Sequence, residues 1–453
     1  MLNPIFERFA EKSPLTVIAR GMMERVLDPE QLDQWFDKNA KEQYTKDLLF
    51  SSVFDIMSQV VCGNRLSVNA AYQAAKDEIG VSITSVYNKL NGIEANTSAE
   101  LVRYAARQVS PVIKALLGKS VAPLPGYRLK LLDGNCIKKS EHRIKELRTI
   151  GAGPLPGKSL VVYDPVMRIP IDVFPCEDGH AQERSLLHLV LFSIVRKDAW
   201  VADRNFCTTE FTCGIDGKGA CFIIREHKKY PWTPIEEERC IGKSDTGTVY
   251  EQRIRVIDEA GKEHEFRRIR IALKKETRDG DKEIAIITNV PKTAATGIKI
   301  AELYQGRWKI ETAFQELATF LNSEITSLGY PRAALFGFCV ALVSYMILSV
   351  VKAALVGAHG EESVEKVSSY YMADEISATY RGMMIAIPDE DWAVFRHMAD
   401  SELLTVLREL SAKVKLSAFR KHPRGPKKPA PKRISSKKHP HVSTAKILAA
   451  RKK

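Results

Sequence analysis

A run of 19 uncharged residues, Ala333–Val351 (AALFGFCVALVSYMILSVV), constrains the fold of this 453-residue chain more than any other feature. A segment this apolar has to be covered on every side, by lipid or by protein. Its length is close to the roughly 20 residues that span a bilayer, so a membrane protein is one interpretation. However, the run contains Gly337, Ser344, Tyr345 and Ser349, and no second run accompanies it. We therefore predict a helix buried in the core of a large soluble domain.

Positive charge is concentrated at the C-terminal end of the chain. The whole chain carries a net charge of +13, with 68 Lys and Arg against 55 Asp and Glu. Residues 413–453 contribute fifteen of these cations and no acid, so residues 1–412 carry −2. Without apolar periodicity, residues 413–453 are predicted to form a disordered basic tail. Such a tail attracts DNA phosphates, while an RNA-binding tail and a solvated tail are the alternatives.

The eight cysteines and the N-terminal residues bear on the compartment. The cysteines include no C-x-x-C pair, which argues against a zinc site and a compact disulfide framework. The N-terminal residues MLNPIFERFAEKSP carry charges where a signal peptide needs an apolar segment. We therefore expect reduced cysteines and a cytoplasmic protein.

Periodicity divides the chain into helical and strand-rich parts. Residues 1–120 have helical spacing, and apolar strands begin at Tyr127. Three adjacent strands, a helix and a further strand predict an α/β fold with a mixed sheet. Glycine-separated strands then suggest a β-rich insertion, and a long helix is predicted from Lys299 through Leu321. The predicted parts are a helical region (1–120), a first core part (121–210), the insertion (211–280), a second core part with C-terminal helices (281–412) and the tail (413–453).

Within the helical region, residues 66–92 (LSVNAAYQAAKDEIGVSITSVYNKLNG) predict two short helices around a turn at Gly80. Ser82 is placed to cap the second helix, as in a helix-turn-helix. This segment has two interpretations, DNA reading and plain helix packing, because any helical hairpin has a similar pattern.

Two aspartates stand where buried strands are predicted to end. Asp133 ends the apolar strand LKLLD, and Asp203 ends WVAD. Taken singly, each aspartate is explained by an Asx turn or a helix N-cap. Taken together, two strands of one sheet that end in carboxylates can converge on a cation.

A third acid, Glu311, lies on the predicted long helix. At about 100° per residue, Tyr304, Arg307 and Glu311 share one face of that helix. Arg307 and Glu311 can also be a simple i,i+4 ion pair. Three carboxylates suit Mg²⁺, and two such ions about 3.5–4 Å apart would activate and stabilise the oxygens of a displacement at phosphorus.

The segments LLDGN at Asp133, ADRNF at Asp203 and YQGRWKIE at Tyr304–Glu311 resemble a known family. That family is the DDE transposases of bacterial insertion sequences, in the insertion-sequence-four group, and the resemblance spans roughly residues 127–354. The third segment matches the first three members of the signature Y-x2-R-x3-E-x6-K. The signature lysine would fall at Ala318, and Lys309 faces the opposite side of the predicted helix.

The resemblance implies a ribonuclease H-like catalytic domain. It implies that Asp133, Asp203 and Glu311 are catalytic residues that bind Mg²⁺, with Mn²⁺ as a possible substitute. It further implies that Tyr304 and Arg307 contact DNA phosphates. Two assignments of our own are weaker. Arg204 could contact phosphate or form a surface salt bridge, and Asp178 and Glu183 could assist the site or cap helices.

The resemblance also implies a function, which is cut-and-paste transposition by metal-dependent cleavage and strand transfer at the ends of an insertion sequence. The implied partners are double-stranded DNA, as terminal repeats and target, and a second copy of the chain in a homodimer. The expected location is the nucleoid of a bacterial cytoplasm. A catalytically inactive DNA-binding protein derived from a transposase is the alternative.

The predicted insertion contains further candidates for DNA contact. Its arginines alternate along two strands, where they could line a DNA groove or form a solvated hairpin face. They are Arg253, Arg255, Arg267, Arg268 and Arg270. Tyr230 and Trp232 lie in a basic loop, where they could stack on a base or pack beneath the insertion.

Overall fold

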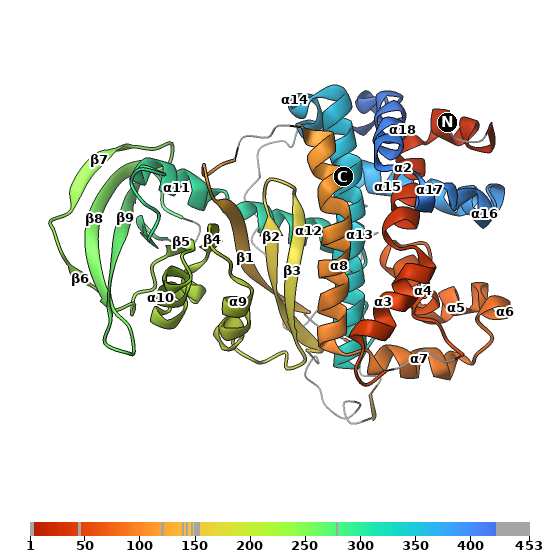
Figure 1. The fold of residues 1–453 in the computed structure, drawn as a ribbon, viewed down its shortest axis with the longest axis horizontal. Coiled ribbons are helices and arrows are strands. Elements are labelled where there is room, and N and C mark those ends of the chain that lie inside the picture. Colours follow the sequence, from red (N-terminus) through yellow and green to blue (C-terminus); the bar gives the residue numbers. More distant parts are fainter. Residues whose placement is uncertain are drawn as a thin grey trace, which may run out of the picture.

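The structure is a computed structural model that describes residues 4–43, 47–118, 122–137, 140–141, 144–145, 148, 155–277 and 280–422. It is a mixed α/β protein in which one large sheet lies beside a layer of helices (Figure 1). The strand-rich end carries β6–β9, and the helices of both chain termini gather at the other end. The coarse prediction of a mixed α/β fold is therefore confirmed.

The sheet has ten strands in the order β3-β2-β1-β4-β5-β10-β9-β8-β6, with β7 paired to β8. β1 and β4 pair in parallel, as do β4 and β5, and the other pairs are antiparallel. The strands are β1 (Arg128–Ile137), β2 (Gly157–Asp164), β3 (Ile169–Cys176), β4 (Asp198–Ala202), β5 (Cys221–Arg225), β6 (Thr233–Pro234), β7 (Arg239–Lys243), β8 (Gly247–Ile257), β9 (Glu263–Leu273) and β10 (Glu283–Thr288).

The strands predicted as an insertion continue the same sheet. β10 pairs with β5 on one side and with β9 on the other, so hydrogen bonds run from the first strands into the later ones without a break. The start of this region differs from its predicted β character, because Thr209–Gly217 form helix α10, capped by the hydroxyl of Thr208. The apolar residues of α10 have helical spacing and pack with the same face of the sheet as α9 (Leu187–Ser193).

The N-terminal region is helical throughout its described residues, as predicted. Its helices are η1 (Pro4–Phe6), α1 (Glu7–Lys12), α2 (Pro14–Val26), α3 (Pro29–Asn39), α4 (Phe50–Val61), α5 (Val68–Ala74), α6 (Lys76–Ile79), α7 (Ile83–Gly92) and α8 (Ala95–Leu117). Gly80 makes the turn in the left-handed region at φ +67, and Ser82 caps α7 by accepting from the amide of Ser85. Lys89 of α7 points inward, with its ammonium 4.7 Å from the ring centre of Phe36. DNA reading by this segment remains a prediction.

Two consecutive helices and a C-terminal bundle complete the fold. They are α11 (Gly297–Gln305), α12 (Trp308–Phe320), α13 (Pro331–His359), α14 (Glu361–Glu365), α15 (Ser369–Ala386), α16 (Asp389–Trp392), α17 (Val394–His397), α18 (Asp400–Ala412) and η5 (Leu416–Phe419). Two short 3-10 helices, η3 (Glu183–Leu186) and η4 (Arg204–Phe206), flank the strand β4.

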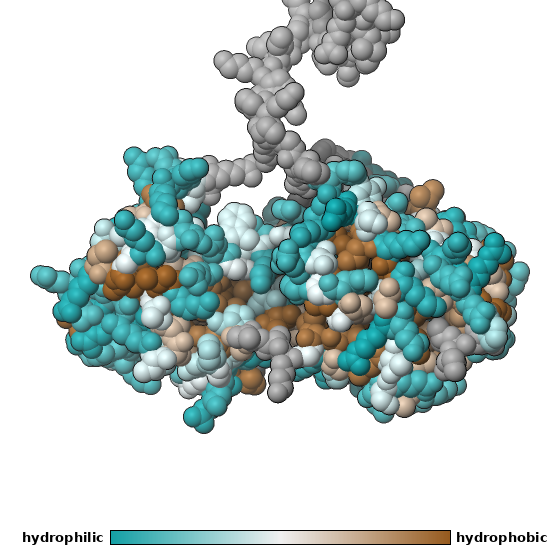
Figure 2. Space-filling model, turned by 90° about the horizontal axis from the view of Figure 1, so that it is seen from above, coloured by the Kyte–Doolittle hydropathy of each residue, from teal (hydrophilic) through white to brown (hydrophobic). Residues whose placement is uncertain are grey.

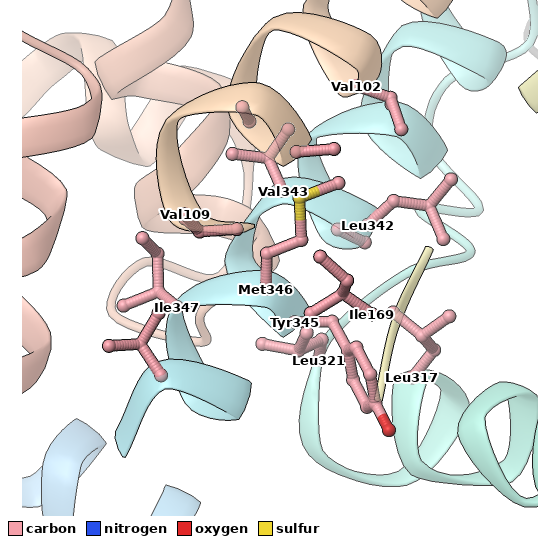
Figure 3. Close-up of a cluster of buried hydrophobic side chains, with 14 of the residues drawn as sticks. Val102, Val109, Ile169, Leu317, Leu321, Leu342, Val343, Tyr345, Met346 and Ile347 are labelled. Atoms are coloured by element: carbon pink, nitrogen blue, oxygen red, sulfur yellow. The ribbon is translucent and has the colours of Figure 1, made fainter. Parts of the chain in front are cut away.

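The apolar run forms the middle of α13, in agreement with the core-helix interpretation. Among the described residues, α13 is the one helix long and apolar enough to cross a bilayer, and 94% of its apolar window is buried inside the protein. α13 runs beside α8, and Leu342, Val343 and Met346 lie in one cluster with Val102 of α8 and Leu317 of α12 (Figure 3). Protein therefore covers this helix where a bilayer would otherwise be required.

The described part of the predicted tail, residues 413–422, is packed against the protein. Leu416–Phe419 form η5, and Arg420 makes an isolated bridge with Val367. Val414 is only 5% exposed and belongs to the main core. Apolar residues at 414, 416 and 419 thus tie this segment to the C-terminal bundle, while residues 423–453 lie outside the described residues.

The surface seen from above is mostly hydrophilic, and hydrophobic residues gather toward its middle (Figure 2). This distribution is ordinary for a folded protein, because apolar atoms always supply part of the accessible surface.

Two leucines test the role of α13 in stability. Leu342→Ala removes a side chain that is 1% exposed, and we expect a loss of about 2–5 kcal/mol in the free energy of unfolding. Leu66→Ala makes the same chemical change at a side chain that is 94% exposed, and should change it by less than about 0.5 kcal/mol. Urea unfolding followed by circular dichroism measures both, and equal effects would contradict a core role for α13.

Candidate active site

Asp133 and Asp203 lie on neighbouring parallel strands. The register pairs Leu132 of β1 with Ala202 of β4, and the pairing stops there. Asp133 and Asp203 are therefore the next residues on each strand, and adjacent strands are about 4.8 Å apart. Asp133 is not at the end of its strand as predicted, because β1 continues to Ile137 along its other neighbour, β2. The sheet splits after Leu132, and the two carboxylates lie at that split.

The third acid comes from a pair of helices where one was predicted. α11 ends at Gln305 and α12 begins at Trp308. Between them the amide of Arg307 donates to the carbonyl of Tyr304 (3.0 Å), and that of Ile310 donates to the carbonyl of Arg307 (3.1 Å). These i,i+3 bonds tighten the turn. The prediction of an unbroken helix is wrong at Gly306 and Arg307.

Arg307 joins two of the three predicted acids. Its Nη1 donates to Oδ2 of Asp133 (3.2 Å), and its Nη2 lies 2.6 Å from Oε1 of Glu311. The side chains of Arg307, Asp133 and Glu311 are 10%, 19% and 31% exposed. The ion pair between Arg307 and Glu311 that the sequence suggested is therefore present, and Asp133 binds the same guanidinium.

Tyr304 connects the third carboxylate to the same cluster. Its hydroxyl donates to Oδ1 of Asp203 at 3.4 Å, which is a long hydrogen bond. Burial, followed by the charge of Asp203, raises the pKa of Tyr304, so this phenol stays protonated and can donate. All three predicted acids, with Tyr304 and Arg307, thus gather where β1, β4 and α12 meet.

Burial and neighbouring carboxylates act together on Asp133. Burial raises the pKa of Asp133 to about 6, Arg307 and the amide of Gly134 oppose this rise, and Glu311 and Asp203 add to it. Each neighbouring carboxylate therefore makes ionisation of Asp133 harder. A positive charge placed among the three acids relieves this repulsion, and Arg307 supplies one such charge.

The oxygen donors of the cluster suit a hard cation such as Mg²⁺. Within the described part of the chain, however, no three His, Cys, Asp or Glu side chains stand close enough together to hold a metal ion. The carboxylate oxygens are therefore of the type that binds a divalent metal. In this structure Arg307 is paired with two of these carboxylates, Asp133 and Glu311.

Three residues were weaker candidates for the site: Arg204, Asp178 and Glu183. Arg204 is exposed, and its positive charge is one of the causes that lower the pKa of Asp281. Contact of Arg204 with phosphate remains a prediction. Asp178 accepts from the amide of His180 (2.9 Å), which is the local turn role. Glu183 opens η3, and its carboxylate lies directly against Gly134.

Two features of the site escaped the sequence analysis. A Cβ at Gly134 would overlap the carboxylate of Glu183, so the end of that side chain lies directly against this glycine beside Asp133. Trp308 follows Arg307 and is 61% exposed, with the guanidinium carbon 5.7 Å from the centre of its ring. The sequence signal for Trp308 was its place inside YQGRWKIE, but periodicity alone does not separate a rim aromatic from a core one.

Two residues of α12 bear on the missing signature lysine, Ala318 at its position and Lys309. Ala318 is exposed on α12. Lys309 lines a separate cavity with Glu316 and Lys352, in agreement with the expectation that it faces away.

The arginines of β8 and β9 are engaged with glutamates rather than free. Arg267 is 7% exposed and also donates to the carbonyls of Val290 and Ala295. The closest pairs are Arg253–Glu236 (3.2 Å), Arg255–Glu263 (3.3 Å), Arg267–Glu251 (2.9 Å), Arg268–Glu226 (2.8 Å) and Arg270–Glu238 (2.5 Å). Tyr230 is 6% exposed and bonded to Thr212 (2.7 Å), so packing, not base stacking, describes it. Trp232 donates to Glu226 (2.7 Å).

Comparison with known proteins gives one family match. Residues 126–347 match the family model of the transposase DDE domain, a span that contains all three acids. The match supports a DDE transposase. No curated protein matches the chain.

Among solved structures, the chain is similar to a cryo-EM structure of the piggyBac transposase synaptic complex with hairpin DNA. The two chains are 9% identical, with a TM-score of 0.38, and the alignment covers 82% of this chain and 81% of the other.

A double-mutant cycle tests the partly buried bridge. We expect a coupling energy of about 1–3 kcal/mol between Arg307→Ala and Glu311→Ala, because the pair is shielded and Asp133 shares it. The pair Glu362/Lys366 has the same i,i+4 spacing at 2.9 Å but is 88% and 58% exposed, and should couple by less than about 0.5 kcal/mol. Urea unfolding of the four proteins in each cycle gives the energies. Equal coupling in both cycles would show that Arg307 does not organise the cluster.

Proposed function

We propose that this chain is a DNA transposase that cleaves insertion-sequence ends and joins them to target DNA by a cut-and-paste reaction. One observation carries the proposal. Asp133, Asp203 and Glu311 come from three distant segments and gather at one split in the sheet, inside the span that matches the transposase DDE domain. Placement in the insertion-sequence-four group rests on the segment YQGRWKIE.

The proposed core is ribonuclease H-like. Its support is the strand order β3-β2-β1-β4-β5, in which β1, β4 and β5 are parallel and β2 is antiparallel to β1. In such an open sheet, a split between neighbouring parallel strands is a natural place for a ligand.

In this proposal Asp133, Asp203 and Glu311 hold Mg²⁺, for which Mn²⁺ would substitute. The bound metal would activate the attacking oxygen and stabilise the leaving one at phosphorus. Arg307 would hold Asp133 and Glu311 in place, and its planar guanidinium would contact phosphate. The hydroxyl of Tyr304 would hold Asp203 in place. Arg204, exposed beside Asp203, would contact the DNA backbone.

Double-stranded DNA is the proposed substrate, as terminal repeats and as target. The fifteen cations of residues 413–453 support this choice, because neutralised phosphates release counterions. A homodimer would bring two transposon ends together, and the nucleoid of a bacterial cytoplasm is the proposed location.

A catalytically inactive DNA-binding protein is the second candidate. The observation that favours it is Ala318 on the exposed face of α12, where the signature has lysine. This candidate would bind DNA but would not cleave it with any divalent metal.

Strand cleavage tests the catalytic proposal. Purified protein, incubated with its own flanking DNA and Mg²⁺, should cut one strand at the element's end. Asp133→Asn, Asp203→Asn and Glu311→Gln should each lower the rate about 100-fold or more, because each removes a charge that holds the metal. Gel analysis of end-labelled DNA measures the rates, and chelation of the metal should stop the reaction.

Asp178→Asn is the matched control, because this acid accepts a hydrogen bond within its own turn and should keep the wild-type rate. Full cleavage by the Glu311→Gln protein would remove α12 from the catalytic site. Binding without cleavage by the wild-type protein in Mg²⁺ and in Mn²⁺ would favour the inactive candidate.

A further inference from the structure

A groove of about 560 Å³ lies at the opposite end of β1 and β4 from the carboxylates. One wall is the helix α8, and Ser193 at the end of α9 lies on the other side. Arg128 and Lys130 belong to its lining, two residues apart on β1 and therefore on one face of the sheet. The groove thus lies about five residues of strand away from Asp133.

The α8 wall presents a stripe of polar and cationic side chains. Arg103, Arg107, Ser110 and Lys114 all line the groove, at spacings of four, three and four residues. This spacing places them on one face of a helix. The stripe is therefore a continuous feature along about three turns of α8 and not a chance cluster of loop residues.

Some of these cations already have carboxylate partners. Arg103 bonds Asp172 (2.5 Å), and Lys130 bonds Asp198 (2.6 Å). In contrast, Arg107 and Lys114 are exposed, and the described residues provide neither with an ion pair. The charge available to a ligand therefore comes chiefly from Arg107 and Lys114.

Lys130 and Trp200 also line the groove. The ammonium of Lys130 lies 5.0 Å from the ring centre of Trp200, its partner in the strand register. The indole nitrogen of Trp200 is buried, with no hydrogen-bond partner in the described part of the chain. Asp172 is the one acid that lines the groove within the described residues, so cations outnumber acids there.

We propose that this groove binds the phosphate backbone of duplex DNA, at a site separate from the carboxylate cluster. The proposal rests on the proposed function, and it adds a second region of contact to the same substrate. Arg107 and Lys114 are seven residues apart, which is about 10.5 Å along a helix. Each strand of B-DNA has one phosphate per about 3.4 Å of helix axis, so this separation matches the axial rise of about three base pairs when α8 lies parallel to that axis. Free phosphate has the same oxygen chemistry and is the competing occupant.

The salt dependence of DNA binding tests this proposal on the full-length protein. The double variant Arg107→Gln/Lys114→Gln should bind a 40-base-pair duplex about tenfold or more weakly at 0.1 M salt. Its slope of log K against log[salt] should be shallower by about 2, since each lost phosphate contact removes about 0.9. Fluorescence anisotropy in Ca²⁺, without Mg²⁺, measures binding alone.

Two controls accompany the double variant. Lys12→Gln/Lys262→Gln removes the same charge from exposed positions on α1 and on the β8–β9 turn, and should keep the wild-type slope. The charge-preserving exchange Arg107→Lys/Lys114→Arg should also keep it. Thermal unfolding of each protein establishes that the variants fold.

If the wild-type protein binds and cleaves DNA and the double variant keeps the wild-type salt slope, the groove is not a DNA site. The proposed function would still stand. A wild-type protein that neither binds nor cleaves DNA would overturn both. Stabilisation by inorganic phosphate that depends on Arg107 and Lys114, with unchanged DNA binding, would assign the groove to free phosphate and refute a DNA site.

Discussion

The burial of α13 is the constraint on which the rest of the structure depends. A helix that is apolar on all sides has to be surrounded, and no single neighbour can surround it. α2, α4 and α7 cover it from the N-terminal region, α8 runs along its length, and α18 packs from the C-terminal end. One core therefore runs from Phe6 to Val414 and includes one face of the sheet. The helical region predicted for residues 1–120 shares this core with the part of the chain that carries the candidate site.

The same arrangement places the carboxylates. α12 lies between α13 and β1, where Leu317 is buried in the main core and Glu311 reaches the split between β1 and β4. The position of Glu311 is therefore set by packing on the side of α12 that faces the core. Arg307 then joins Glu311 to Asp133, so the electrostatic cluster is fixed to the hydrophobic core through one helix.

Much of this could be predicted from the sequence, for physical reasons that differ from element to element. β1, β2, β3 and β4 were found because buried strands are short apolar runs between turns. α13 was predicted because a run of 19 uncharged residues has to be covered by lipid or by protein. The three acids were proposed as a set because two of them follow apolar strands and the third shares a helix face with Tyr304 and Arg307, and the resemblance to a family supported that set. Without the other acids, Asp133 and Asp203 were each explained by a turn or a helix cap, and Glu311 by an ion pair with Arg307.

The sequence predictions failed where the local pattern and the tertiary structure disagree. Thr209–Gly217 contains Thr, Phe and Cys, which are common in strands, yet Thr208 caps it as a helix. The tight turn at Gly306 and Arg307 has no proline, and helical periodicity runs through it. The arginines of β8 and β9 looked like a DNA-facing row. Their partners are Glu251 on β8 and two glutamates outside the strands, Glu226 and Glu238, and period-two alternation does not reveal such pairs. The close approach of Glu183 to Gly134 joins segments that are far apart in the sequence.

The unbroken sheet has a mechanical consequence. β10 is bonded to β5 on one edge and to β9 on the other, so the β6–β9 end cannot swing as an independent lid. A load applied to the long β8–β9 ribbon passes through β10 and β5 to β4, whose last residue precedes Asp203. Whatever grips that distant ribbon therefore pulls on the backbone that carries a carboxylate of the site, through a chain of amide-to-carbonyl bonds and without any moving hinge.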